Sequence, residues 1–235
     1  MAGLGTLYLV PVPLAEGSRG QDAELARLVA ELTEWIVETP KVARAQLRAL
    51  YPAIDQDALV LQSWSKHGDN SARDLLRPCL EGRSMGLISD AGAPGMADPG
   101  ADVVAVAHEL GITVVPWPGP SSVLLGLMAS GLGGQQFSFY GYLPHEAGAR
   151  RSQLARMERE AAQGSSHWFI ETPYRNSKLF AELLQVLHPS TKLFVGVNLT
   201  APTEWLATRA VAEWKRTGIP PQIAAKAPAI WGIGR

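Results

Sequence analysis

Cysteine is almost absent from this chain of 235 residues, since Cys79 is its only one. A single cysteine excludes an intramolecular disulfide and any metal site built from several thiolates. We expect Cys79 to fill space on the apolar face of Leu75, Leu76 and Leu80. No apolar run reaches the roughly 18 to 20 residues of a membrane-spanning helix, and the first residues lack the pattern of a secretion signal. The composition, 46% hydrophobic and 18% charged, predicts a globular, cytoplasmic enzyme.

Lysine and arginine are missing from residues 84–149, although this stretch holds several carboxylates. Such a segment does not attract phosphate. From residue 150 onward the balance reverses, with 12 basic side chains against six acidic ones. Four of the basic ones cluster locally: Arg150, Arg151, Arg156 and Arg159. The net charge of −1 argues against a protein that coats nucleic acid, but the basic cluster is compatible either with local contact to nucleic acid or with an ordinary solvated surface.

Short apolar runs alternate with segments of helical period along nearly the whole chain, which is typical of α/β architecture. Amphipathic helices are expected around Leu25–Leu32 and Leu179–Leu187. The runs predict strands at 6–12, 59–63, 84–89, 112–116, 137–140, 167–171, 192–197 and 228–233. Three prolines within Pro116–Pro120 exclude a continuous helix or central strand there, so we expect one domain over residues 1–117 and a second over 118–235.

Three helices are expected to begin with a short polar residue followed by proline, at Thr39-Pro40, Asp98-Pro99 and Thr172-Pro173. The polar side chain can accept from free backbone amides, and proline has no amide to satisfy in the first turn. Glu38 and Glu171 precede two of these starts, which places each glutamate at the carboxyl end of a strand. Open α/β sheets bind their ligands at that end.

The most unusual segment is the small-residue loop 89–100, S-D-A-G-A-P-G-M-A-D-P-G. Its glycines permit close backbone approach to a ligand, and Asp90 and Asp98 could accept from ribose hydroxyls or from an ammonium group. The chain lacks the pattern G-x-G-x-x-G and the phosphate loop G-x-x-x-x-G-K-[ST]. The loop is therefore either a binding site for a ligand without phosphates or an elaborate turn.

Five motifs follow one another in order: Pro13 after the first strand, the loop 89–100, P-G-P-S-S at 118–122, F-Y-G-Y-L-P at 139–144 and E-T-P-Y-R at 171–175. This series resembles that of the tetrapyrrole methylase superfamily, class III of the methyltransferases that use S-adenosylmethionine. Within it, the chain is most similar to the branch of the small-subunit ribosomal RNA cytidine 2′-O-methyltransferases, as a divergent paralogue. The resemblance implies two α/β domains, S-adenosylmethionine in the cleft between them, and a homodimer.

The resemblance also assigns residues to the cofactor site. It places Pro13 beside the cofactor and the first three loop residues around its methionine and ribose part. It matches Ser121 and Ser122 to the serine or threonine after the second Pro-Gly, Glu171 and Thr172 to a strand end bordering the adenosine, and Thr200 and Pro202 to a loop that closes over the adenine. The expected cofactor loop consists of Ser89, Asp90, Ala91, Gly92, Pro94, Gly95, Met96 and Asp98.

Three segments depart from the family pattern on the acceptor side. Where the branch has P-I-G-N, E-D-T-R and H-x-H-N-E, this chain has P-L-A-E at 13–16, E-T-P-K at 38–41 and S-K-H-G-D at 65–69. A ribose hydroxyl is a weak acid, so a general base should assist methyl transfer. The candidates are Glu38 and His67, although a lone histidine is more often structural and Glu38 could simply end a strand. The remaining histidines show no metal-ligand spacing, so no metal is expected.

The sequence thus predicts a methyltransferase that uses S-adenosylmethionine and methylates an RNA ribose 2′-hydroxyl, with ribosomal RNA or the small ribosomal subunit as partner. Two alternatives stay open. The acceptor could be a tetrapyrrole or another small molecule, or the altered segments could leave a cofactor-binding module without catalysis.

Overall fold

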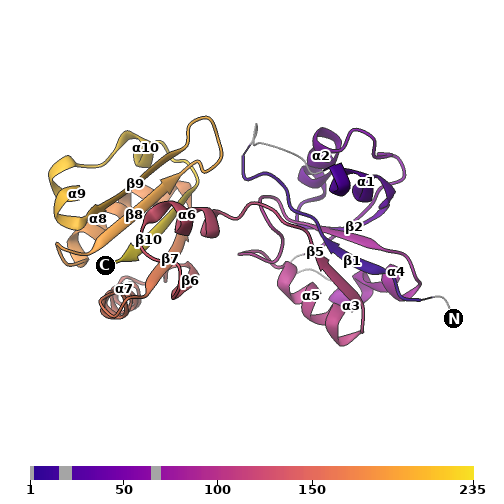
Figure 1. Cartoon of the computed structure of the whole chain (residues 1–235), viewed down its shortest axis with the longest axis horizontal. Helices are drawn as coiled ribbons and strands as arrows, with labels where there is room; N and C mark the ends of the chain where they lie inside the picture. Colours follow the sequence, from indigo (N-terminus) through magenta and orange to yellow (C-terminus); the bar gives the residue numbers. More distant parts are fainter. Residues whose placement is uncertain (1–2, 16–22, 65–69) are drawn as a thin grey trace. The chain divides into compact units, whose positions relative to one another are not determined.

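The computed structural model describes residues 3–15, 23–64 and 70–235, and the chain divides into two compact units with the boundary between Ser121 and Ser122. This boundary lies a few residues after the one expected from the proline-rich segment. Each unit is an α/β domain with its own five-stranded sheet (Figure 1), so the expected fold class is confirmed.

The first unit has an all-parallel sheet with the strand order β3-β2-β4-β1-β5. The strands are β1 (Thr6–Leu9), β2 (Glu34–Val37), β3 (Val60–Ser63), β4 (Met85–Ile88) and β5 (Thr113–Pro116). The described helices are α1 (Ala23–Glu31), α2 (Pro40–Leu50), α3 (Ala72–Leu75), α4 (Arg77–Leu80) and α5 (Gly100–Glu109). Because every strand is parallel, all five carboxyl ends lie at one edge of the sheet.

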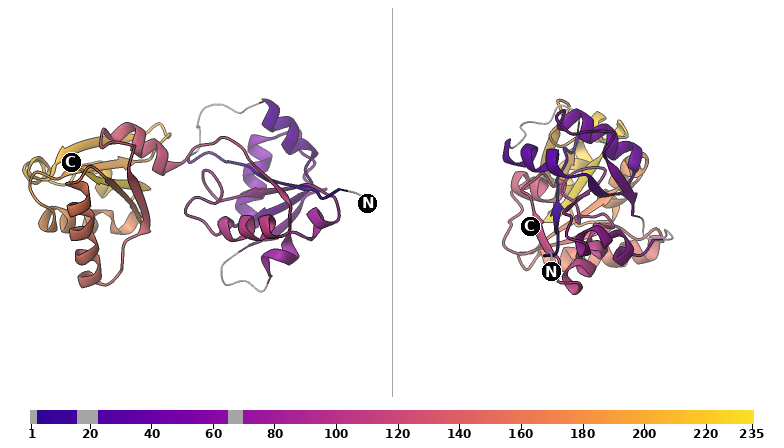
Figure 2. Two further views of the ribbon diagram at one scale, coloured as in Figure 1. Left: turned by 60° about the horizontal axis from the view of Figure 1, so that its bottom comes forward. Right: turned by 90° about the vertical axis from the view of Figure 1, so that its right-hand side faces the viewer.

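Helices cover both faces of this sheet (Figure 2), and successive strand residues alternate between two cores. Trp35 packs with α1 and α2 on one face, whereas Ile36 packs with α3, α4 and α5 on the other. Gly86, paired with Trp35 in register, leaves room for its ring, because a Cβ there would lie 2.3 Å from the indole. Cys79 is fully buried in the second core, and burial raises the pKa of its thiol to about 11.

The second unit has a mixed sheet with the order β6-β7-β10-β8-β9, in which only β6 and β7 are parallel neighbours. The strands are β6 (Phe137–Tyr142), β7 (Ser166–Glu171), β8 (Lys192–Val197), β9 (Trp205–Ala210) and β10 (Ala229–Gly234). The helices are α6 (Ser122–Ser130), α7 (Ala147–Ala161), α8 (Asn176–Val186), α9 (Val211–Thr217) and α10 (Pro221–Ala224), with a 3₁₀ turn η1 (Pro173–Arg175).

The core of the second unit is rich in aromatic rings, which carry large buried areas. Phe169, Phe180 and Trp231 pack with α7, α8, α9 and α10 on one face of the sheet. Helix α6 lies on the other face, where Gly126 approaches Trp168 so closely that a Cβ would lie 3.0 Å from its ring. The two faces are therefore covered by different helices.

All eight expected strands and both expected amphipathic helices are confirmed, with ends that differ by a few residues. The first strand ends at Leu9, earlier than expected, because Pro11 and Pro13 cannot continue ladder hydrogen bonds. Strand β9 was not expected, whereas β2 was expected only as a strand that ends before Glu38, without bounds. Among the residues that the structure describes, no helix is long and apolar enough to cross a membrane.

Candidate functional site

The expected cofactor residues of the first unit gather at the carboxyl edge of its parallel sheet. Pro13 follows β1, Glu38 follows β2, and the loop that starts at Ser89 follows β4. Ser121 ends the segment after β5 and is buried. Strand β1 lies between β4 and β5, so the loops after these three strands are neighbours at the point where the winding direction of the sheet reverses.

Backbone hydrogen bonds join three of these segments. The amide of Val12 donates to the carbonyl of Gly92 at 3.0 Å, and the amide of Ala93 donates to the carbonyl of Pro120 at 2.9 Å. Gly92 has a φ of +77°, and a Cβ there would lie 2.9 Å from Leu14 Cδ2. Only glycine meets both constraints without strain, which fixes the middle of the loop against the neighbouring strand ends.

Asp90 connects this loop to α2. Its carboxylate accepts from the Thr39 amide at 3.2 Å and from the Thr39 hydroxyl at 2.7 Å, while Gln46 Nε2 donates to the Asp90 carbonyl at 2.7 Å. The expectation that Thr39 accepts at the start of the helix was wrong, because its hydroxyl donates to the stronger acceptor instead. Helix α2 nevertheless begins at Pro40, as expected.

Asp98 closes the other end of the loop. Its Oδ1 and Oδ2 accept from the Gly95 amide at 3.0 and 2.9 Å, and Oδ1 accepts from the Gly100 amide at 2.6 Å. Both loop aspartates therefore stabilise the conformation of the loop without a ligand. A carboxylate has about four lone-pair sites, so Asp90 keeps capacity for about two further donors and Asp98 for about one.

The rest of the loop is open at its surface. Ser89 is buried and donates to the Ala91 carbonyl at 3.2 Å, whereas Ala91 is exposed and Met96 is 42% exposed. Pro94 is buried at the base of the loop. Ala97 holds a φ of +66°, an unusual value for a residue with a side chain. Strain of this kind concentrates at binding sites.

An open pocket of about 570 Å³ lies beside the loop. Its acidic walls are Glu38, Asp98 and Asp102, and Trp64 forms an aromatic wall. The Trp64 indole is fixed by a hydrogen bond from Nε1 to the Pro99 carbonyl at 2.9 Å. Among the described residues, the lining side chains include three carboxylates and no cation, which suits a ligand that is positively charged or rich in hydrogen-bond donors.

Glu38 is exposed at this edge and has an altered acidity. Partial burial of its carboxylate, together with the negative charges of Asp90 and Asp98, raises the pKa of Glu38 above the ordinary value. A hydrogen bond from the Asp90 amide to Oε2, at 3.3 Å, acts in the opposite direction but does not cancel this effect. A carboxylate with a raised pKa is a better proton acceptor near neutral pH. His67, the other candidate base, lies outside the described residues.

The expected cofactor residues of the second unit share one edge of its sheet. Glu171 ends β7 and accepts from the Thr172 amide at 2.7 Å and from the Thr172 hydroxyl at 3.2 Å. Thr172 therefore does not cap the following turn with its side chain, contrary to expectation. Thr200 and Pro202 lie in the turn after β8, and Val197 and Glu171 both pair with Ala229, which places that turn at the same edge. Ser122 is the first residue of α6.

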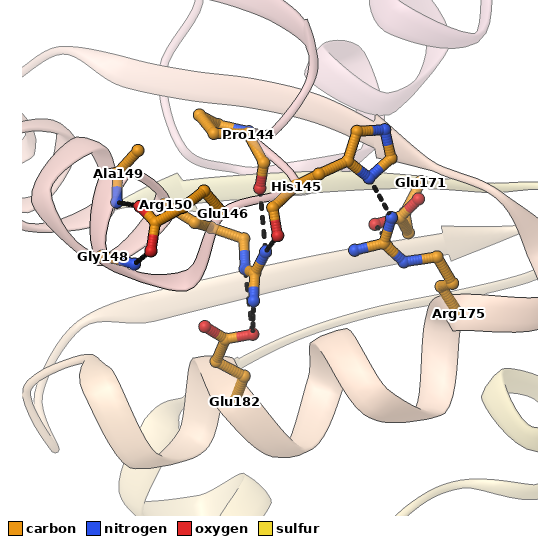
Figure 3. Close-up of polar contacts among 9 residues, drawn as sticks. All are labelled: Pro144, His145, Glu146, Gly148, Ala149, Arg150, Glu171, Arg175 and Glu182. Atoms are coloured by element: carbon orange, nitrogen blue, oxygen red, sulfur yellow. Dashed lines mark hydrogen bonds and ion pairs between the residues drawn. The ribbon is translucent and has the colours of Figure 1, made fainter.

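A buried network of polar contacts around Arg150 lies at this edge (Figure 3), and the sequence did not predict it. Arg150 is 5% exposed; its Nε and Nη2 contact Glu182 Oε2 at 2.9 and 2.7 Å, and its Nη1 donates to the carbonyls of Pro144 and His145. The sequence placed Arg150 in a surface cluster, and its only distinguishing signal is its position four residues after the helix-capping Glu146. Within the described ranges, no group of histidine, cysteine and acidic side chains could hold a metal ion.

The sequence is similar to those of several known proteins. Ribosomal RNA small subunit methyltransferase I of Vibrio cholerae is 30% identical over 214 residues, covering 90% of this chain and 70% of that protein. The protein of the same name from Mesorhizobium japonicum is 32% identical over 213 residues, 88% of this chain and 69% of that protein. The one from Micromonospora olivasterospora is 31% identical over 186 residues, and the match spans 79% of this chain but only 57% of its relative.

Solved structures share the fold at lower identity. The methyltransferase CobJ is 17% identical, with a TM-score of 0.62 over 99% of this chain and 94% of that one. Uroporphyrin-III C-methyl transferase from Thermus thermophilus, complexed with S-adenyl homocysteine, is 18% identical, with a TM-score of 0.55 over 98% of each chain. No protein-family model matches the chain. The identity to these relatives and the extent of the matches show that the chain belongs to the family of ribosomal RNA small subunit methyltransferase I, and it has the tetrapyrrole methylase fold.

Proposed function

We propose that this protein transfers a methyl group from S-adenosylmethionine to a ribose 2′-hydroxyl of RNA, with small-subunit ribosomal RNA as the substrate class. Its homologues are methyltransferases that use S-adenosylmethionine. The observation that carries the cofactor part of the proposal is the pocket beside the loop 89–100, whose described lining includes the carboxylates of Glu38, Asp98 and Asp102. The RNA acceptor is supported by the curated relatives. A cytoplasmic location, where ribosomal RNA is modified, is part of the same proposal.

The residues at this edge fit the cofactor. S-adenosylmethionine carries a sulfonium and an ammonium but no phosphate, so its charge complements these carboxylates. Gly95 has a φ of +83°, and no heavy atom lies within 4 Å of the position that a Cβ would take. Backbone without a side chain, next to open space, allows a ligand to lie directly against the chain.

When bound, S-adenosylmethionine supplies a methyl group that is already activated for transfer, so the chain itself has to align the acceptor and exclude water. In this proposal the loop 89–100 and Pro13 hold the cofactor, and Trp64 walls the neighbouring pocket against solvent. Glu38 accepts the proton of the 2′-hydroxyl as the hydroxyl oxygen forms its bond to the methyl carbon; the bond from that carbon to sulfur breaks, and S-adenosylhomocysteine leaves with the electron pair. The raised pKa of Glu38 supports this role.

Glu171, Thr172, Thr200, Pro202 and Ser122 complete the cofactor site in this proposal, as the resemblance implies. The homodimer is also proposed. Two apolar side chains of α6, Leu124 and Met128, are 46% and 80% exposed, and a second copy would bury such surface.

A methyl-transfer assay with labelled S-adenosylmethionine tests the proposal. Small ribosomal subunits from cells without the gene should accept label on ribose, and nuclease digestion should release a 2′-O-methylated nucleotide. Label on uroporphyrinogen instead would favour the tetrapyrrole alternative. Cofactor binding without transfer to RNA, to the tetrapyrrole or to any component of a cell extract would favour a binding module.

Gly95→Val should weaken binding of S-adenosylhomocysteine by about tenfold or more, because valine is strained at positive φ and its side chain occupies the space next to the backbone. Gly111→Val is the matched control. Gly111 also has a positive φ, +72°, and no heavy atom lies within 4 Å of the position that a Cβ would take, but it lies between α5 and β5 at the opposite edge. Both variants should lose similar stability, whereas calorimetry should show lost affinity for Gly95→Val alone; equal affinity in both would mean that the loop has been misassigned.

A further inference from the structure

Exposed aromatic and cationic side chains gather around the carboxyl ends of β6 and β7 in the second unit. Tyr174 is 81% exposed and Tyr142 is 57% exposed, which is unusual for large aromatic residues. We call these two, with His145, Arg175 and Lys226, the edge surface. None of them is itself among the residues of the proposed cofactor site, although Arg175 pairs with Glu171, which is.

A β-bulge sets the position of Tyr142 on the edge strand β6. The pairing of β6 with β7 shifts in register between Phe139 and Tyr142, and Gly141 in this interval has a φ of +64°. Bulges bend a strand and redirect its side chains, often next to functional sites. Tyr142 pairs with Ile170, one residue before the end of β7, so it lies close to the turn that carries Tyr174.

Arg175 is held between two partners (Figure 3). Its Nε lies 3.4 Å from Glu171 Oε2, and its Nη1 lies 2.5 Å from His145 Nδ1. Arginine can only donate, so Nδ1 is the acceptor and the hydrogen of the neutral His145 ring lies on Nε2. The guanidinium keeps further N–H donors, and with 30% of its side chain exposed it can offer them to a ligand.

Tyr174 has a cation beside its ring. Lys226 Nζ lies 5.7 Å from the centre of the ring, within the range of a cation–π contact. The segment with Lys226 is fixed to the turn by the fully buried Asn176, whose Nδ2 donates to the Ala227 carbonyl at 2.7 Å. Lys226 has no carboxylate within ion-pair distance among the described residues, so none of these neutralises its charge.

A rigid frame supports these exposed groups from below. Arg150 holds the carbonyls of Pro144 and His145, and Glu182 neutralises its charge in the interior. Exposed side chains on a fixed, buried polar frame lose little conformational entropy when they bind a ligand.

We propose that the edge surface binds single-stranded RNA, with a base stacked on Tyr174 and phosphates contacted by Lys226 and Arg175. This inference rests on the proposed function and identifies a surface that would take hold of its RNA. Aromatic rings next to cations are the combination that single strands require, because every base has a π-face and every linkage has a charge. Tyrosines among charged groups suit a membrane or an apolar protein groove less well, since both require continuous apolar surface.

The test is a fluorescence anisotropy titration of the full chain, without cofactor, with a fluorescein-labelled single-stranded RNA of about 16 nucleotides and mixed sequence. Tyr174→Ala should weaken binding by about 5-fold to 100-fold, the usual effect of losing one stacked base. Tyr174→Phe keeps the ring and should bind within about twofold of the wild type. Tyr174 is so exposed that neither change should affect folding.

Lys226→Gln should reduce the dependence of log K on log salt by about 0.7, the value for one phosphate contact on a single strand. Lys192→Gln is the matched control, because Lys192 is exposed at the start of β8, at the opposite edge of the same sheet, and should leave the slope unchanged. Wild-type affinity in Tyr174→Ala, or an equal loss of slope in both lysine variants, would overturn the proposal.

Calorimetry with S-adenosylhomocysteine on the same variants separates this proposal from the one on which it rests. The account predicts unchanged cofactor affinity where RNA affinity falls. A wild-type chain that binds RNA through Tyr174 but no cofactor would defeat the proposed function and support the edge surface. A chain that methylates RNA with unchanged affinity in Tyr174→Ala would support the function and refute the edge surface.

Discussion

Glu38→Gln should lower the rate of methyl transfer by about a hundredfold or more, the usual contribution of a general base. Glutamine keeps the shape of the side chain and can still accept the hydrogen bond from the Asp90 amide, but it cannot take up a proton. Cofactor affinity should therefore stay within a few-fold of the wild type, so that the loss appears in kcat. Single-turnover transfer from labelled S-adenosylmethionine to small ribosomal subunits measures this.

Two further measurements distinguish a base from a residue with a merely structural role. In the wild type, the rate should fall on the acidic side with an apparent pKa above that of an ordinary glutamate, since burial and the charges of Asp90 and Asp98 raise the pKa of Glu38. Glu38→Gln should lose this acidic limb. Glu109→Gln, which changes an exposed carboxylate at the far end of α5, should keep both the rate and the limb. A near-normal rate in Glu38→Gln would remove Glu38 from the mechanism.

The raised pKa of Glu38 also predicts that Glu38→Gln, which lowers the rate, increases the stability of the fold. A carboxyl whose pKa is higher in the folded chain than in the unfolded one binds more protons when folded, so its ionisation destabilises the fold as pH rises through that pKa. Glu38→Gln should thus melt slightly above the wild type at about pH 7, and this advantage should vanish as pH falls below the pKa of Glu38. Lower activity with a higher melting temperature would be the signature of a functional residue.

Arg150→Met should destabilise the second unit by about 3–5 kcal/mol, because it leaves the Glu182 carboxylate buried without its partner. It also removes the donor for the carbonyls of Pro144 and His145, so the loop after β6 should loosen and RNA affinity should fall with it. Differential scanning calorimetry should show the loss in the transition of the second unit, with the first unit little changed.

A double variant provides the control. Arg150→Met with Glu182→Leu replaces the ion pair by apolar groups and should recover most of the lost stability, as is common when both members of a buried pair are replaced. Arg156→Ala removes an arginine of the same helix whose pair with Glu160 is exposed, and it should leave the melting curve unchanged. If Arg150→Met melts like Arg156→Ala, the Arg150 network does not hold this edge together.

Local patterns were sufficient for most of the fold and for part of the site. Apolar runs located eight strands and proline-marked starts located the beginnings of helices, because both signals depend on neighbouring residues. Strand β9 was missed since it is partly exposed along its length and includes Thr208 and Arg209, which hides any alternation. Strand β2 was expected only from its end before Glu38, and its extent was not predicted, because a short connection separates it from α1 and its apolar residues merge with the helical pattern.

Contacts between distant residues could not be predicted. Thr39 was expected to cap a helix, but its hydroxyl donates a hydrogen bond to Asp90, 51 positions away. Arg150 was placed in a surface cluster, but Glu182 lies on a helix 32 positions later and makes its burial possible. Polar side chains have several possible partners, and only the tertiary fold selects among them.

Hydrogen–deuterium exchange of the whole chain, with and without saturating S-adenosylhomocysteine, would locate the bound methyl donor. If the loop after β4 receives it, peptides over 89–100 should exchange more slowly with the ligand, while the turn at Gly111 should exchange at the same rate in both states. Identical exchange over 89–100 in the two states would contradict the account.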